Sequence, residues 1–185
     1  MTADRTALLV IDCQVDFGSP EGEMARRGMD MAAPQAAVAK AEVLVEAARA
    51  AGVKVIFVRL ATQPGGDEAL CVEGTSGADF IGPQPQAGEA VVSKTRYSAF
   101  SRTGLAEQLQ TVGIDTVVLA GLTTECCVAS SAWDGFERDF HIVIASDACA
   151  AYELDLHRHA LKALEMSGAV ITLSAAVAAG WKKSL

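Results

Sequence analysis

The chain has 185 residues, of which 51% are hydrophobic and 21% are charged. This length and composition fit one compact domain, so we expect residues 1–185 to form a single domain and exclude a disordered chain. The 15 Lys and Arg against 23 Asp and Glu give a net charge of −8 without a basic stripe, so nucleic acid is not an expected partner. No apolar run approaches the ~20 residues that a bilayer requires, so no membrane partner is expected either.

The N-terminal residues and the cysteines favour a cytoplasmic protein. Residues 1–5 lack a basic region, and the apolar stretch that follows ends at Asp12, which does not fit a secretory signal. The number of cysteines is odd, none has C-x-x-C spacing, and Cys126 and Cys127 are adjacent, which is a poor arrangement for a structural disulfide. We therefore expect reduced thiols, at least one of them reactive.

Short runs rich in Val, Ile and Leu alternate with longer helical patterns, which is typical of a parallel sheet with helices on both faces. The expected strands are residues 7–12, 54–59, 90–92, 116–120, 141–145 and 169–172. Because these runs do not alternate between apolar and polar residues, we expect each strand to be buried on both sides. The predicted fold class is α/β, one doubly wound domain with about six mostly parallel strands.

Start and stop residues place the helices between these strands. The first is expected from Pro34 to the residue before Gly52, and the others at residues 103–111, 124–138, 155–167 and 174–179. In the fourth helix an apolar stripe is expected to face inward: Leu156, Ala160, Leu161 and Leu164. Residues 61–86, with five glycines and three prolines, form a long excursion from the carboxyl end of the second strand, where open α/β sheets bind ligands.

Three residues whose side chains could take part in catalysis lie at or after the ends of three different strands. They are Asp12, Lys94 and Cys127, and each alone has an ordinary interpretation: a turn-capping acid, a solvated loop lysine and a buried inert thiol. Because all three are expected at the same edge of the sheet, a shared functional site is favoured over these separate interpretations. A thiol at a helix N-terminus near a lysine is expected to favour the thiolate, and Asp12 could accept its proton. No histidine follows these strands, so a Cys–His pair is not expected.

These residues lie in segments that resemble a known family. Residues 8–17 (LLVIDCQVDF), 94–100 (KTRYSAF) and 121–128 (GLTTECCV), followed by DACAA at 147–151, resemble the signatures of the isochorismatase-like cysteine hydrolases, in order along nearly the whole chain. The resemblance implies a catalytic triad of Asp12, Lys94 and Cys127. It assigns the nucleophile to Cys127 and not Cys126, because the family nucleophile directly precedes a valine.

The resemblance implies further features of the site and the assembly. One is a cis peptide between Leu122 and Thr123, with the N–H groups of Thr123 and Cys127 forming an oxyanion hole; the alternative is an ordinary trans turn. Another is a homo-oligomer, a dimer or a tetramer.

The expectations about cofactors and metals follow from a difference between this sequence and the metal-binding members of the family. Nicotinamidases of this superfamily bind a metal through Asp and His residues after the second strand, and this segment has no histidine here, so we expect no metal and no cofactor. Residues 71–78 resemble the Glu-Gly-Thr-x-Gly-Ala segment of biuret and ureidoacrylate amidohydrolases. Glu73 is therefore a candidate substrate contact, although an exposed loop acid is the competing interpretation.

The leading functional prediction is a metal-independent hydrolase that cleaves a non-peptide C–N bond of a small amide, ureido or carbamoyl compound through a thioester. The alternatives are vinyl-ether hydrolysis of isochorismate, which does not require a cysteine, and a catalytically silent binding module. Aromatic residues near the triad in sequence are candidate substrate contacts, with core packing as the competing use: Phe17, Tyr97, Phe100 and Trp133. Arg26 and Arg27 could meet a substrate carboxylate, but such a pair is more often solvated.

Overall fold

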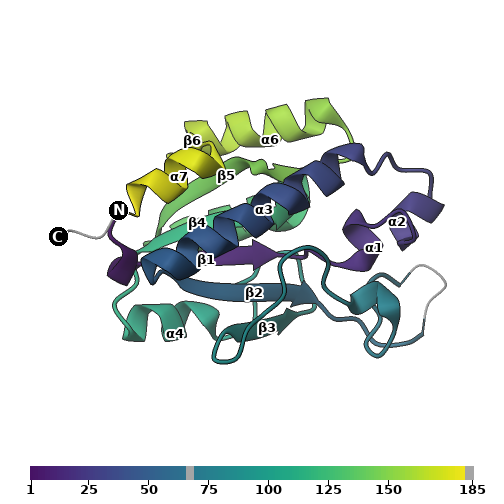
Figure 1. The fold of residues 1–185 in the computed structure, drawn as a ribbon, viewed down its shortest axis with the longest axis horizontal. Coiled ribbons are helices and arrows are strands. Elements are labelled where there is room, and N and C mark those ends of the chain that lie inside the picture. The colour runs from purple at the N-terminus through teal and green to yellow at the C-terminus, as the bar shows by residue number, and fades with distance from the viewer. Residues whose placement is uncertain (66–68, 182–185) are drawn as a thin grey trace.

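A computed structural model describes residues 1–65 and 69–181, which form an open parallel sheet with helices on both faces (Figure 1). The six strands are β1 (Thr6–Ile11), β2 (Lys54–Leu60), β3 (Ala90–Lys94), β4 (Thr116–Leu122), β5 (His141–Ala150) and β6 (Val170–Thr172). They are all parallel, in the order β3-β2-β1-β4-β5-β6. This confirms the predicted α/β class and the strand positions, with β5 extending five residues beyond its expected end.

Two apolar cores lie on the two faces of the sheet. On one face α3 (Ala32–Ala51) and α7 (Ser174–Gly180) pack on alternate strand residues such as Leu8 and Val10. The other face is covered by α4 (Leu105–Thr111), α5 (Ala129–Phe136) and α6 (Leu154–Met166), which pack on residues such as Leu9 and Ile11. The central strands are buried on both sides because each face has its own helical layer.

The short elements are all near the sheet ends: η1 (Ala3–Arg5), α1 (Val15–Gly18), α2 (Glu23–Arg26), η2 (Ser76–Ala78) and the π-helical turn η3 (Thr124–Val128). Of these, η1, α1, α2 and η2 were not expected from the sequence, because elements of three or four residues carry no measurable periodicity. No helix in the described part of the chain is long and apolar enough to cross a bilayer.

Two expectations about burial are wrong. Strands β3 and β6 are the edges of the sheet, and Val91 and Val170 are 43% and 56% exposed, so these strands are not buried on both sides. Leu156 was expected to face the core but is 44% exposed, because it lies in the first turn of α6, while Leu164 near the other end of that helix is buried.

The connectivity leaves a crevice beside β1. From β1 the chain continues outward to β2 and β3, then returns to β4 on the other side of β1. Such a reversal of strand order is where open α/β sheets bind ligands, at the carboxyl ends of the strands. Gly121 allows the backbones of β4 and β1 to lie close together at this point, because a Cβ at position 121 would lie 1.9 Å from the carbonyl oxygen of Ile11.

Candidate active site

The structure brings together three residues at or after the carboxyl ends of β1, β3 and β4. The Lys94 Nζ lies 2.7 Å from Asp12 Oδ2 and donates a hydrogen bond to Cys127 Sγ at 3.3 Å. It also donates to the carbonyl oxygen of Arg96 at 3.1 Å. Asp12 and Lys94 are at most 1% exposed and Cys127 is 5% exposed. An acid, a cation and a thiol therefore meet in a site shielded from bulk water.

The backbone around Asp12 is specialised. Its φ of 49° lies in the left-handed region, which non-glycine residues rarely adopt and which commonly marks functional positions. The Asp12 N–H donates to the carbonyl oxygen of Val58, and its own carbonyl accepts from the Gln14 N–H, both at 2.8 Å. Gln14 then binds backbone groups of Leu60 and Ala78, so the end of β1 is held against β2 and the excursion that follows it.

Cys127 lies in η3, the π-helical turn that leads into α5. Ser131 donates a hydrogen bond to the Cys127 carbonyl oxygen at 2.6 Å and accepts one from the Ala99 N–H at 2.9 Å. This serine joins the cysteine turn to the segment after Lys94. The peptide bond between Leu122 and Thr123, just before η3, is cis.

Burial and neighbouring charges set the protonation of the three groups. Burial raises the pKa of Asp12, although Lys94 opposes this. Burial lowers the pKa of Lys94, but the charge of Asp12 and the hydrogen bonds with Asp12 and Cys127 are among the causes that act against burial, and the pKa is raised. The pKa of Cys127 is raised by burial and by Asp12, against the opposing effect of Lys94. The expectation that the thiolate is favoured is therefore wrong, because burial and Asp12 outweigh the effect of Lys94 on the thiol.

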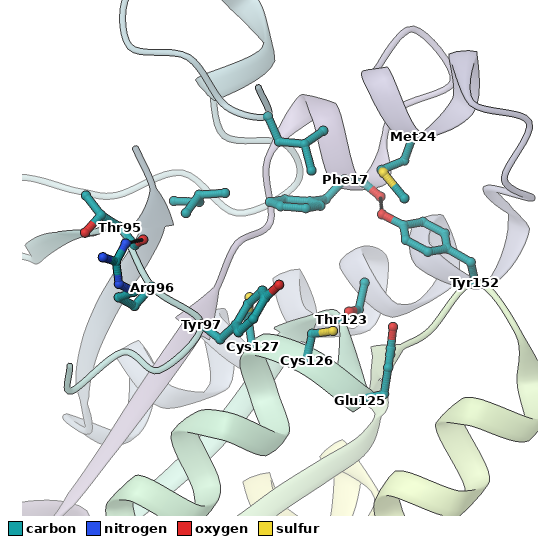
Figure 2. A pocket seen from close by; sticks show the side chains of 12 residues that line it. Phe17, Met24, Thr95, Arg96, Tyr97, Thr123, Glu125, Cys126, Cys127 and Tyr152 are labelled. Carbon is teal, nitrogen blue, oxygen red and sulfur yellow. Dashed lines mark hydrogen bonds between the residues drawn. The ribbon is translucent and has the colours of Figure 1, made fainter. Parts of the chain in front are cut away.

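A cavity of about 550 Å³ opens at Cys127 (Figure 2). Twelve residues line it: Phe17, Met24, Leu60, Leu70, Thr95, Arg96, Tyr97, Thr123, Glu125, Cys126, Cys127 and Tyr152. In Figure 2 the cysteine turn lies below, with Phe17, Met24 and Tyr152 above it. The Tyr152 hydroxyl donates to the carbonyl oxygen of Phe17 at 2.9 Å, which joins the end of β5 to α1. The cavity is large enough for a small molecule.

Of the aromatic residues named from the sequence, Phe17 and Tyr97 line this cavity and two do not. Phe100 is buried in the core, where its ring stacks on Phe140 with centroids 5.5 Å apart. Trp133 is 43% exposed on α5, away from the cavity lining. For both, proximity in sequence to Lys94 or Cys127 was misleading, since Phe100 turns into the core and Trp133 lies on the exposed side of α5.

The charged candidates also lie outside the cavity. Glu73 is exposed, borders a separate hollow and accepts a hydrogen bond from Gln63. Arg26 and Arg27 both form ion pairs with Glu23 in α2.

Several residues of the site have no signal in the sequence. Tyr152 and Met24 reach the cavity from β5's far end and from α2, which only the tertiary structure brings there. His157 in α6 forms a 2.8 Å hydrogen bond through Nδ1 with Thr124 Oγ1, the first residue of η3, so a histidine does approach this end of β4 without contacting Cys127. Within the described ranges, no three His, Cys, Asp or Glu side chains are grouped closely enough to hold a metal ion.

Comparisons with known proteins show what the chain as a whole is similar to. The isochorismatase domain model matches residues 6–176. A ureidoacrylate amidohydrolase RutB of Pantoea ananatis is 33% identical over 174 residues, covering 80% of this chain and 70% of that protein.

Among solved structures, an isochorismatase-like hydrolase from Alkaliphilus metalliredigens superposes with a TM-score of 0.85 at 27% identity, covering 96% of this chain and 97% of the other. An N-carbamoylsarcosine amidase from Thermoplasma acidophilum has a TM-score of 0.77 at 28% identity, with 92% and 96% covered.

Proposed function

The chain belongs to the isochorismatase family of hydrolases, and on this premise we propose that it hydrolyses a C–N bond of a small amide, ureido or carbamoyl compound. The observation that carries the proposal is the contact of Lys94 with both Asp12 and Cys127 beneath a cavity of small-molecule size. The relatives named for ureidoacrylate and N-carbamoylsarcosine support a substrate of the same chemical class.

The first half of the reaction forms a thioester. The Asp12 carboxylate accepts the Cys127 thiol proton while the sulfur attacks the substrate carbonyl carbon. The raised pKa of both groups suits this transfer, because the thiol is protonated at rest and Asp12 is a stronger base than a solvated carboxylate. Protonated Asp12 then gives this proton to the leaving nitrogen as the C–N bond breaks, releasing the amine.

The second half returns the enzyme to its resting state. Asp12 accepts a proton from water while the water oxygen adds to the thioester carbonyl. The carbon–sulfur bond then breaks, and the Cys127 sulfur recovers the proton from Asp12. The product is a carboxylic acid, or a carbamic acid when the substrate is a ureido compound.

Two further groups stabilise charge in these steps. Lys94 keeps Asp12 ionised and offsets the negative charge that passes from carboxylate to sulfur. The N–H groups of Thr123 and Cys127 serve as the oxyanion hole for the tetrahedral intermediate. Both residues line the cavity, which supports this role.

The two adjacent cysteines provide a matched test. Ammonia or amine release is measured over a panel of small amides, ureides and carbamoyl amino acids for the wild type, Cys127→Ser and Cys126→Ser. We expect turnover to be lost in Cys127→Ser, because serine is a much weaker nucleophile beside a carboxylate base. Cys126→Ser should keep substantial activity, since Cys126 lines the cavity but does not contact Lys94 in the hydrogen bonds described. Equal activity of Cys127→Ser and wild type would refute the mechanism.

A further inference from the structure

Glu125 has an unusual environment for a carboxylate. It lies on the cysteine turn η3 and lines the cavity, where Figure 2 shows its side chain directed into the space beside Cys126. Its Oε2 is shielded from solvent and accepts no hydrogen bond from any residue that the structure describes. A buried polar atom without a partner lowers stability, which makes Glu125 a candidate for contact with a bound ligand.

The neighbouring protein groups do not satisfy this carboxylate. The Tyr152 hydroxyl, which also lines the cavity, donates its hydrogen bond to the carbonyl oxygen of Phe17 instead. The charge of Glu125 is felt nearby: after the larger effect of burial, it contributes to the raised pKa of both Cys126 and Tyr152. A hydrogen-bond donor on a molecule bound in the cavity could therefore pair with this carboxylate.

Two charged side chains of the described part of the chain line the cavity, on opposite sides of Cys127. In Figure 2, Arg96 is on one side and Glu125 on the other, with Tyr97, Cys126 and Cys127 between them. A ligand whose carbonyl carbon lies over Cys127 thus meets an acceptor on the Glu125 side. An anionic group placed there would be repelled, whereas an N–H group would be bound by a charge-assisted hydrogen bond.

We propose that Glu125 is a specificity-determining residue that selects carbamoyl substrates, whose carbonyl carbon bears a terminal amino group beside the leaving nitrogen, by accepting a hydrogen bond from that amino group. This inference rests on the proposed function. In that mechanism the leaving nitrogen faces Asp12, from which it takes its proton, so the N–H available to Glu125 belongs to the other substituent of the carbonyl carbon. An N-acetyl compound carries a methyl group at that position and leaves Glu125 without a donor.

The test compares an N-carbamoyl and an N-acetyl derivative of the same amine, which differ only by an amino group against a methyl group. Glu125→Met should lower kcat/KM for the carbamoyl compound by about 10- to 100-fold, the usual effect of losing a hydrogen bond to a charged group. The N-acetyl compound should be affected much less. Glu125→Gln keeps the shape and one acceptor oxygen, so it should retain an intermediate preference.

Two further readouts separate recognition from a structural role. Glu73→Met is the matched control, because Glu73 is an exposed glutamate outside the cavity, and its substrate preference should equal that of the wild type. The melting temperature of Glu125→Met should be equal to or above that of the wild type, since the substitution removes an unpaired buried oxygen.

The outcomes distinguish this inference from the proposed function. If the wild type hydrolyses both compounds and Glu125→Met loses the same factor on each, the selection by Glu125 is refuted while C–N hydrolysis stands. If the wild type hydrolyses neither these compounds nor any other member of the amide and ureide panel, the proposed function fails and this inference fails with it. A loss confined to the carbamoyl compound supports the assignment.

Discussion

Replacing Lys94 with methionine tests the electrostatics of the site, because it removes one partner of a fully buried ion pair while keeping a long unbranched side chain. The Nζ to Oδ2 distance is 2.7 Å and neither side chain is exposed. Breaking such a pair leaves Asp12 as an uncompensated buried charge, which costs about 3–5 kcal/mol. For a chain of this size that corresponds to a fall in melting temperature of about 6–20 °C.

The same replacement also predicts in which direction the loss of stability changes with pH. Without Lys94, the pKa of folded Asp12 rises further above its unfolded value of about 3.9, since burial then acts unopposed by that charge. A carboxyl group with a raised folded-state pKa destabilises the protein above the unfolded pKa, and the penalty disappears as the pH falls and the group is protonated. The deficit of Lys94→Met should therefore be largest near neutral pH and smaller near pH 4.5.

Chemical denaturation of the wild type, Lys94→Met and the double variant Lys94→Met/Asp12→Asn at both pH values measures these effects. The double variant removes both charges, so it should be more stable than Lys94→Met at pH 7. A loss below about 1 kcal/mol at pH 7, or a deficit that does not change with pH, would refute the description of Asp12 as a buried carboxylate balanced by Lys94.

Three other predictions follow from the site. Lys94→Ala should move the iodoacetamide alkylation of Cys127 to higher pH, whereas Asp12→Asn should move it to lower pH and still lose turnover by orders of magnitude; shifts in the same direction would contradict the opposing effects of these charges on the thiol. Activity should survive exhaustive EDTA treatment, and recovery that depends on added metal would overturn this. His157 has a lowered pKa because of burial and then Arg158, so its contribution to stability is present above its unfolded pKa and lost as the pH falls below it. His157→Gln should flatten the fall in melting temperature between pH 7.5 and 5.5, and an unchanged slope would exclude this residue as its source.

The fold was predictable from the sequence because the central strands are continuous apolar runs. The runs that became β1 and β4 are buried on both faces, as their composition indicates. The same argument failed for β3 and β6, since a short apolar run looks alike at the centre and at the edge of a sheet, and only the strand order separates the two. The grouping of Asp12, Lys94 and Cys127 was predictable for a related reason: parallel strands bring the residues at and after their carboxyl ends to one edge of the sheet.

The rest of the site depends on contacts between distant segments. Tyr152 reaches the cavity because β5 continues to Ala150, five residues beyond its expected end, and because its hydroxyl bonds to Phe17. Phe100 shows the reverse case, since it follows Lys94 closely but the chain turns it into the core. Whether such a side chain points into the cavity or into the core cannot be read from the spacing of residues in the sequence. The protonation state of Cys127 was likewise missed, because the amount of burial, and not the nearby lysine, decides it.

The covalent intermediate on Cys127 is the central claim, and hydroxylamine partitioning tests it most directly. Two amides that share one acyl group but differ in leaving amine are hydrolysed in the presence of hydroxylamine, and the ratio of hydroxamate to acid is measured for each. Because both substrates would form the same thioester, we expect the same ratio from both and no product from Cys127→Ser. A ratio that varies with the leaving amine, or hydroxamate formation by Cys127→Ser, would contradict an acyl-enzyme at this residue.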